Sequence, residues 1–386
     1  MTQHDIGDQS NTWTSLGTQR LLELGLTDAN LRGQAVRVLG ASDYVFKTLE
    51  GDSSLRELIQ TKWLTKPLNA QAYTDEATAI TADCSDEATL MHVLRKMRKR
   101  HMVRLGWRDI GQLAQFDDVV AETSWLADAI IDTALSHLHE WAVKRRGTPR
   151  DSEGNEQHLI VLALGKLGAG ELNFSSDIDL IFAFANSGET DCASRTESND
   201  EFFTRLARRL IHVLDTVDKD GFVFRVDMRL RPFGNSGPLV TSTSAVERYY
   251  ETHGRDWERY ALIRARVVAG GKVEGESLLR DLQPFIYRRY LDFGALESIR
   301  EMKALINIEV RREGLQDNVK IGPGGIREVE FIAQAFQLVR GGRMPVLRRR
   351  EVRPVLQHLA EHGLLPGHAA RDLYGAYEFL RTLEHR

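Results

Sequence analysis

The first 150 residues carry the hydrophobic spacing of helices. Apolar side chains recur three and four positions apart, which is the repeat of one helix face. The clearest run consists of Leu126, Ile130, Ile131, Leu135 and Leu138. Leu22 and Leu26 show the same four-residue step, although Gly25 between them weakens the helical pattern. We therefore expect helix after helix, with few strands, up to about residue 150.

The pattern changes near residue 150. The polar segment 145–157 contains Gly and Pro, and we expect a linker there. Two short apolar runs follow, at 158–165 and 178–184, and each predicts a buried strand. The stretch 186–199 is small and polar, so we expect a surface loop. From Asp200 to Val217 the apolar positions have helical spacing again, until Gly221 stops the helix.

The segment 222–233 alternates strictly between apolar and polar residues. Its apolar positions are Phe224, Val226, Met228 and Leu230, and its polar positions are Arg225, Asp227, Arg229 and Arg231. A period of two is typical of a strand with one buried face. We expect a strand that ends at Pro232, followed by a turn at 234–238.

From about residue 245 the chain returns to helical spacing. We expect helices at 296–313 and 326–340, and we place Trp257 and Tyr260 in the core. The last ten residues have a helical pattern without a stop signal. We therefore expect the chain to be part of a longer protein.

Composition narrows the functional classes. Of 386 residues, 42% are hydrophobic and 27% charged, which is the mix of a soluble globular protein and excludes disorder of the whole chain. The net charge of −4 disfavours a nucleic-acid binder. Cys84 and Cys192 are too few for a disulfide framework or a cysteine zinc site, and the spacing of the twelve His residues does not predict a metal site.

The chain also lacks the patterns of secreted and membrane proteins. Its polar start differs from a signal peptide, and no apolar run approaches the roughly 20 residues of a membrane helix. We expect a cytoplasmic protein that binds neither a membrane nor nucleic acid.

Two carboxylates form the most informative motif. Asp177 and Asp179 are two positions apart at the start of an apolar run, so on a strand both point to the same face. Such close carboxylates ionise together most readily around a cation, and oxygen ligands suit Mg²⁺. A lone Asp-x-Asp is also common in solvated loops and caps. The apolar flanks favour a metal site here, because an unpaired carboxylate on a core strand is costly.

A Gly-rich turn precedes the two carboxylates. Gly165, Gly168 and Gly170 would let backbone N–H groups approach a phosphate, and Lys166 and Ser176 could add donors. The order of a Gly-rich turn followed by Asp-x-Asp resembles the signature of the polymerase-beta-like nucleotidyltransferase superfamily. The chain departs from this signature in having Lys166 after the first Gly, where Ser is usual.

The superfamily resemblance implies a third carboxylate on a later strand, and Asp227 is the candidate. An alternative role for Asp227 is an ion pair with Arg225 or Arg229.

A closer resemblance covers the chain from about residue 90 to its end. The motifs are GKLGAGELNFSSDIDLIF, FRVDMRLRPFGNSGPLV, GRDWERYALIRARVV and KIGPGGIREVEFIAQ. In this order they resemble the bifunctional enzymes that adenylylate and deadenylylate glutamine synthetase. The forms at 233–240 and 255–260 resemble the N-terminal, adenylyl-removing half of that family.

The resemblance implies an α+β, mostly helical fold: a nucleotidyltransferase core with a small mixed sheet between helical segments. We expect an N-terminal helical region at 1–120, the catalytic domain at 121–270 and a C-terminal helical region at 271–386.

The resemblance also implies the chemistry. Inorganic phosphate would attack the AMP on an adenylylated tyrosine of glutamine synthetase and release ADP. Asp177, Asp179 and Asp227 would be catalytic and hold two Mg²⁺ ions. The expected phosphate- and nucleotide-binding residues are Gly165, Lys166, Gly168, Ser176, Arg229 and Arg231, with Arg264 and Arg266 ranked after Arg229 and Arg231. Further expected partners are the uridylylated signalling protein PII and glutamine as an effector.

Several alternatives stay open at this point. The first alternative is an enzyme that adds AMP to a protein or small molecule, because the same residues would serve that reaction. The second is a regulatory PII-binding module without enzymatic activity. The Gly-rich loop at 322–325 is either an anion site before a helix or a tight turn chosen for packing. Glu328 and Glu330 either pair with the Arg-rich segment or approach the metals.

Overall fold

The computed structural model describes residues 3–193, 195–288, 297, 300, 301, 303, 304, 308, 311, 312, 314, 315 and 317–385. These residues form two compact units. The first runs to Ala129 and includes Lys219–Gly221, and the second contains Ile130–Asp218 and Phe222–His385. The domain boundaries expected from the sequence stay a prediction.

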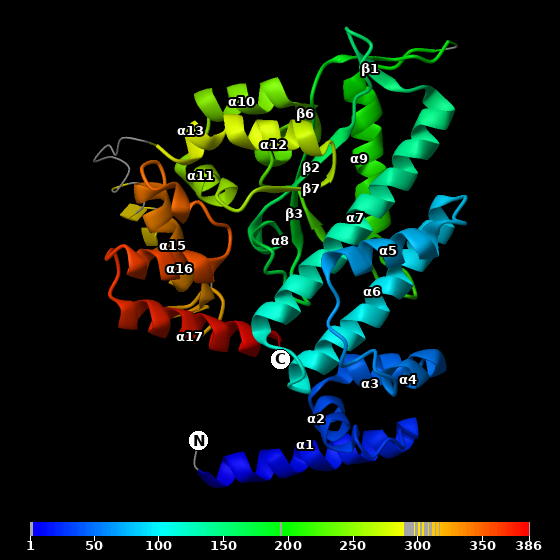
Figure 1. Cartoon of the computed structure of the whole chain (residues 1–386), viewed down its shortest axis with the longest axis vertical. Helices are drawn as coiled ribbons and strands as arrows, with labels where there is room; N and C mark the ends of the chain where they lie inside the picture. The colour runs from blue at the N-terminus through cyan, green and yellow to red at the C-terminus, as the bar shows by residue number, and fades with distance from the viewer. Residues whose placement is uncertain are drawn as a thin grey trace. The chain divides into compact units, whose positions relative to one another are not determined.

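The first unit is helical, in agreement with its apolar spacing (Figure 1). Its helices are α1 (Gln3–Leu24), α2 (Arg32–Ala41), α3 (Asp43–Glu50), α4 (Ser53–Ile59), α5 (Ala70–Thr81), α6 (Glu87–Ile110) and the first part of α7 (Phe116–Arg146). Polar side chains begin several of them, because each accepts a hydrogen bond from a free N–H of the first turn. These N-caps are Ser42, Asp52, Asn69 and Asp86. The core of this unit surrounds the buried indole of Trp107.

The second unit contains a small mixed sheet. Its strands are β2 (Leu159–Ala163), β3 (Ile178–Phe184), β5 (Val226–Asp227), β6 (Val240–Ser242) and β7 (Arg266–Gly270). The order is β5-β3-β2-β7, and β6 also pairs with β3. Strand β2 runs antiparallel to β3 and β7, whereas β5 and β6 run parallel to β3. The two buried strands predicted from apolar runs are thus confirmed, and they lie side by side at the centre of the sheet.

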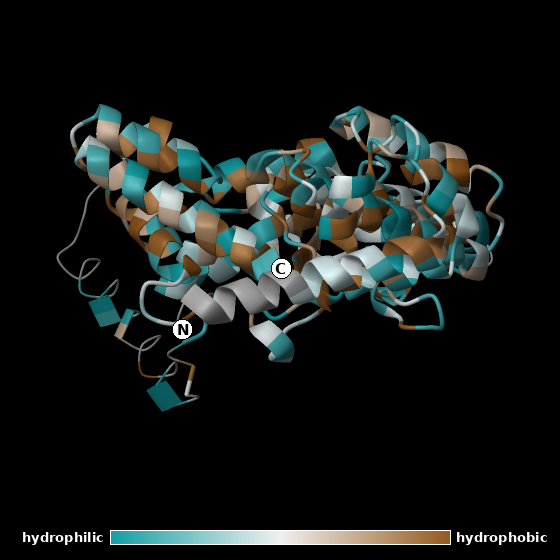
Figure 2. Ribbon diagram, turned by 90° about the horizontal axis from the view of Figure 1, so that it is seen from below, coloured by the Kyte–Doolittle hydropathy of each residue, from teal (hydrophilic) through white to brown (hydrophobic). Residues whose placement is uncertain are grey.

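Helices surround this sheet. They are α8 (Gly165–Ala169), α9 (Asn199–Asp215), α10 (Thr243–Thr252), α11 (Asp256–Leu262), α12 (Lys272–Asp281), α13 (Gln283–Ile286), α15 (Ile326–Arg340), α16 (Val352–Glu361) and α17 (Gly367–His385). Brown and teal positions alternate along many of them in Figure 2, as expected for amphipathic helices with one packed face. Helix α15 confirms the prediction at 326–340, whereas much of the segment 296–313 lies outside the described residues.

The segments expected to be a linker (145–157) and a surface loop (186–199) contain two short strands that pair with each other. Helix α7 continues to Arg146, and β1 (Pro149–Asp151) runs antiparallel to β4 (Gly188–Thr190). The side chain of Asn199 donates to the backbone oxygen of Arg150, and Arg150 pairs with Asp191 at 2.9 Å. Both segments therefore satisfy their backbone polar groups in a sheet, which their polar composition did not indicate.

The strand expected over 222–233 is mostly absent. Only Val226–Asp227 is strand, because the backbone N–H groups on either side bond elsewhere. Those of Val223 and Phe224 donate to the backbone oxygen of Leu214. That of Arg229 donates at 2.8 Å to the carboxylate of Asp227, which turns the chain. The alternation of the sequence therefore does not correspond to a ladder of hydrogen bonds.

Two core residues were predicted on α11, and one prediction was wrong. Tyr260 packs against the core of the second unit, but Trp257 is 40% exposed. Among the described residues, no helix is both long and apolar enough to cross a membrane.

Candidate active site

Strand pairing places two of the predicted carboxylates opposite each other. In the parallel pair of β3 and β5, Asp179 is the register partner of Asp227. Asp177 lies two residues before Asp179, where the chain enters β3. The third carboxylate, which is 48 residues away in sequence from Asp179, thus lies beside the Asp-x-Asp motif, as the resemblance implies. One edge of the sheet collects three negative charges.

Burial and the neighbouring charges of Asp227 and Asp177 together raise the pKa of Asp179 to about 6. Asp179 forms no ion pair with any residue in the described part of the chain. It is therefore a carboxylate that needs a cation to ionise readily at neutral pH.

The other two carboxylates are each held by an arginine. Arg225 donates from Nε to Oδ1 of Asp177 at 2.5 Å and also bonds the backbone oxygen of Ser175. Arg229 bonds both carboxylate oxygens of Asp227, and this hydrogen bonding lowers the pKa of Asp227. Of the two partners considered for Asp227, Arg229 is the one that pairs with it. The sequence analysis considered Arg225 as a partner of Asp227 and missed its pairing with Asp177.

The Gly-rich turn packs directly against Asp179. Gly165 begins the short helix α8 with a φ of +55°, and a Cβ at this position would collide with Oδ2 of Asp179. The backbone N–H of Leu164 donates to the backbone oxygen of Asp179 at 2.9 Å. Gly165 therefore belongs to the surroundings of the carboxylates. Gly168 is different, since it is buried and its missing Cβ makes room for the backbone oxygens of Arg264 and Ala163.

Lys166 is held by the C-terminal helix. Its ammonium bonds both carboxylate oxygens of Glu384 on α17, at 2.8 and 2.7 Å. Burial lowers the pKa of Lys166 to about 8, aided by the positive charges of Arg381 and Lys320. The carboxylate of Glu384 thus pairs with two cations, Lys166 and Arg381.

The other predicted phosphate-binding residues occupy varied places. Ser176 is half-buried in the loop before β3, next to Asp177. Arg231 donates at 2.7 Å to the backbone oxygen of Met228 and braces the turn after β5. Arg264 is buried and pairs with Glu330 at 3.1 Å, and Arg266 bonds the backbone oxygen of Leu167 at 2.9 Å. Arg264 and Arg266 therefore support the backbone around α8.

The Gly-rich loop before α15 forms a tight turn. Gly324 has a φ of +75°, and a Cβ on Gly325 would meet the backbone oxygen of Val319 at 2.6 Å. The carboxylate of Glu328 accepts from the N–H of Gly324 at 3.0 Å, so an acidic side chain already caps this helix end. These contacts favour the packing interpretation of the loop.

The same loop brings Lys320 near the carboxylates, which the sequence did not indicate. The positive charge of Lys320 opposes the rise in the pKa of Asp179 and also acts on Lys166. Lys320 is exposed and forms no ion pair with a described residue. It is therefore available to an anionic ligand beside Asp179.

The donor set at this edge fits Mg²⁺. All three side chains offer carboxylate oxygens, which are the ligands that a hard cation prefers. The carboxylate of Asp179 is partly buried beside the charges of Asp227 and Asp177, which together raise its pKa. Asp177 is 48% exposed at its side chain and Asp227 15%, so solvent and a substrate phosphate can reach the group.

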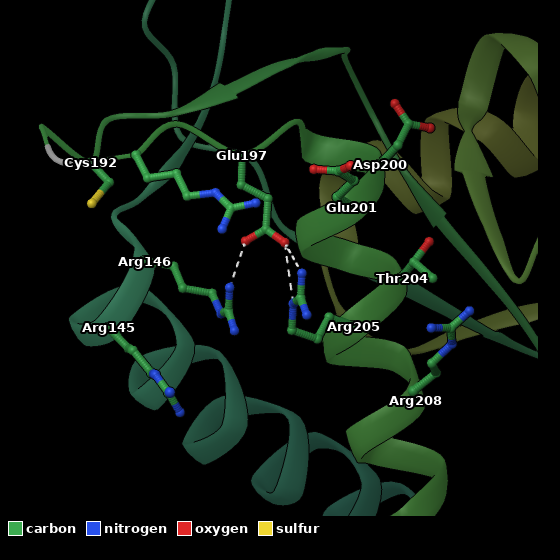
Figure 3. A pocket seen from close by; sticks show the side chains of 10 residues that line it. Arg145, Arg146, Cys192, Glu197, Asp200, Glu201, Thr204, Arg205 and Arg208 are labelled. Atoms are coloured by element: carbon green, nitrogen blue, oxygen red, sulfur yellow. Dashed lines mark hydrogen bonds and ion pairs between the residues drawn. The ribbon is translucent and has the colours of Figure 1, made fainter.

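A separate cavity lies between α7 and α9 (Figure 3). It has a volume of about 680 Å³ and is lined by Arg145, Arg146, Cys192, Arg195, Glu197, Asp200, Glu201, Thr204, Arg205 and Arg208. The carboxylate of Glu197 points between two arginines and pairs with Arg146 at 3.2 Å and Arg205 at 2.5 Å. None of the predicted site residues lines this cavity.

Two known families match parts of the chain. Residues 32–281 match the family described as glutamate-ammonia ligase adenylyltransferase. Residues 300–386 match the family described as GlnD PII-uridylyltransferase.

Three similar curated proteins are named bifunctional glutamine synthetase adenylyltransferase/adenylyl-removing enzyme. The protein of Thioalkalivibrio sulfidiphilus is 51% identical over 91% of this chain and 36% of its own length. That of Nitrosococcus oceani is 51% identical over 95% of this chain and 39% of its own length. That of Pseudomonas aeruginosa is 51% identical over 90% of this chain and 36% of its own length. The chain therefore spans less than two-fifths of the length of these relatives.

The family has a nucleotidyltransferase fold, so the predicted α+β, mostly helical fold with a small mixed sheet is confirmed. The chain belongs to the glutamate-ammonia ligase adenylyltransferase family.

Proposed function

We propose that this chain removes AMP from an adenylylated tyrosine of glutamine synthetase by phosphorolysis. The observation that carries the proposal is the register of β3 and β5, which sets Asp179 opposite Asp227 with Asp177 two residues away. Family membership and the names of the relatives support glutamine synthetase as the protein substrate. The motifs at 233–240 and 255–260 favour removal of AMP over its addition.

The reaction balances without an added oxidant or reductant. An oxygen of inorganic phosphate attacks the α-phosphorus of the tyrosine-linked AMP. The bond from phosphorus to the tyrosine oxygen breaks, ADP forms, and the tyrosine leaves as a phenolate that takes a proton from water. The phenol has a pKa of about 10, so the demand for a general acid is small.

The main difficulty is bringing two anions together. Asp177, Asp179 and Asp227 would hold Mg²⁺, two ions in this proposal, which neutralises charge on the attacking and leaving oxygens. Lys320 would orient the incoming phosphate beside Asp179. Arg225 and Arg229, which pair with Asp177 and Asp227, would add positive charge beside the bound phosphates.

The regulatory partners form part of the same proposal. Uridylylated PII would stimulate the removal of AMP and glutamine would oppose it. The match of residues 300–386 to the PII-uridylyltransferase family supports a link with PII signalling.

A release assay tests the function. Adenylylated glutamine synthetase is incubated with the chain and Mg²⁺, with and without phosphate, using the wild type, Asp177→Asn and Asp281→Asn. Asp281 is an exposed aspartate at the end of α12 and serves as the control. We expect ADP only when phosphate is present, from the wild type and the control. Release of AMP would indicate hydrolysis, and full activity of Asp177→Asn would contradict the proposed site.

A further inference from the structure

Two histidines and a glutamate lie close together near the start of β2, whereas the Gly-rich turn follows the end of this strand. His139 lies on α7, Glu156 lies after β1, and His158 directly precedes β2. In the described part of the chain, these three residues are the group of His, Cys, Asp and Glu whose ligand atoms all lie within 4.8 Å of one another. Their sequence spacing gave no indication of a site, because a helix and two loop positions contribute one residue each.

The distances suit a tetrahedral metal. Nε2 of His139 lies 3.6 Å from Oε1 of Glu156, and Nε2 of His158 lies 3.9 Å from the same oxygen. Ligand atoms at about 2.0–2.1 Å from a tetrahedral Zn²⁺ are roughly 3.3 Å from each other. The two spacings to Glu156 are therefore within about 0.6 Å of those in a tetrahedral site, and the ligand atoms of the two histidines lie within 4.8 Å of each other. Both distances are too long for a hydrogen bond.

His139 supplies a second observation. Its Nε2 is shielded from solvent and has no hydrogen-bond partner among the described residues. An unsatisfied buried nitrogen is costly, and it calls for a ligand on that side of the ring.

A cavity of about 360 Å³ adjoins the three side chains and is lined also by Leu135, Val143 and Leu159. Three protein ligands leave one tetrahedral position open, and the cavity leaves room there for a water molecule. Two imidazoles and a carboxylate are ligands for Zn²⁺, whereas Mg²⁺ prefers an all-oxygen set.

We propose that His139, Glu156 and His158 form a Zn²⁺ site that links α7 to the start of β2. The site is independent of the proposed catalysis, since the three aspartates and the Gly-rich turn lie at the other end of β2. Its role is to fix the position of the central strand against the long helix.

Zinc titration of the full chain tests the proposal. The protein is first treated with a chelator and dialysed, and excess Mg²⁺ is kept in the buffer to occupy carboxylate sites. The variants are Glu156→Gln and the double substitution His139→Asn with His158→Asn. His137→Asn, which removes an imidazole from the same helix, is the control. Calorimetry gives the affinity, and the visible absorption of Co²⁺ reports a tetrahedral site.

We expect the double variant to lose about 100-fold or more in zinc affinity, and the control to keep it. Zinc should raise the melting temperature of the wild type and the control but not that of Glu156→Gln. Equal zinc affinity in all four proteins, or no binding to the wild type, would overturn the site and leave a simple ion-pair cluster. If the double variant does not fold, Glu156→Gln decides, because this glutamate side chain is 45% exposed.

Discussion

The ammonium of Lys166 lies 2.7 Å from a carboxylate oxygen of Glu384, although 218 residues separate them in sequence. This pair ties the turn before Asp177 and Asp179 to the last helix of the second unit. Asn173, in the loop after α8, bonds the same carboxylate. The position of the Gly-rich turn therefore depends on α17.

The stability provided at Lys166 should depend on pH. The pKa of Lys166 is lowered from 10.5 to about 8 in the folded chain. Between these values the unfolded chain binds more protons at this residue, so stability rises with pH. Relative to Lys166→Met, the wild type should gain up to about 3 kcal/mol in unfolding free energy from pH 8 to 10.5.

Urea unfolding of both proteins across this range measures the gain. Lys272→Met, at an exposed lysine of α12, is the control and should follow the wild type at every pH. A constant difference between the wild type and Lys166→Met would show that the lysine is not desolvated by folding.

The buried guanidinium of Arg381 belongs to the same hydrogen-bond network as Lys166, Asn173 and Glu384. Its side chain is fully buried and donates to the backbone oxygen of Glu171, the carbonyl of Asn173 and the hydroxyl of Tyr377. Arg381→Met should destabilise the second unit by about 3–5 kcal/mol, because it removes the buried cation that pairs with Glu171 and Glu384. Arg371→Met, at an exposed position of the same helix, should change stability by about 0.5 kcal/mol or less. Similar unfolding midpoints for the two variants would contradict this role of the network.

The spacing of apolar and acidic residues predicted the parts of the candidate site that are formed by residues close together in sequence. The apolar run at 178–184 identified β3, and the two-residue step between Asp177 and Asp179 placed both at its start. The helices of the first unit followed from their spacing in the same way.

Contacts between distant segments could not be predicted from spacing. Alternation at 222–233 suggested a long strand, yet the carboxylate of Asp227 binds the backbone N–H of Arg229 and ends the strand after two residues. Neither the pair of Lys166 with Glu384 nor the approach of Lys320 to Asp179 has a local signal. Both result from how the C-terminal helices pack in the second unit.

Lys320 offers a test of phosphate binding within the proposed function. Loss of its charge should raise KM for phosphate about five- to tenfold with little change in kcat, because the lysine would bind the ground state and the transition state alike. Lys320 also opposes the rise in the pKa of Asp179. In Lys320→Met this pKa should rise, and the acid limb of the pH profile of kcat/KM should move to higher pH.

Steady-state kinetics with varied phosphate measure both effects, and Lys272→Met again serves as the control. A lower kcat with an unchanged KM and pH profile would indicate a structural role for Lys320 instead.

Alanine substitutions at Gly165 and Gly170 should separate the effect of backbone strain from the effect of a collision with Asp179. Both have a positive φ, +55° and +73°, so alanine costs about 1 kcal/mol of backbone strain at either position. They differ in their surroundings: a Cβ at Gly165 would collide with the carboxylate of Asp179, whereas a Cβ at Gly170 has no heavy atom within 4 Å. Gly165→Ala should therefore displace Asp179 and lower kcat about 100-fold, since a shift of about 1 Å has that effect in active sites. Gly170→Ala should keep near wild-type activity at a similar loss of stability. Release assays and thermal unfolding measure the activity and the stability of both variants. Full activity of Gly165→Ala would contradict the proposed catalytic role of Asp179.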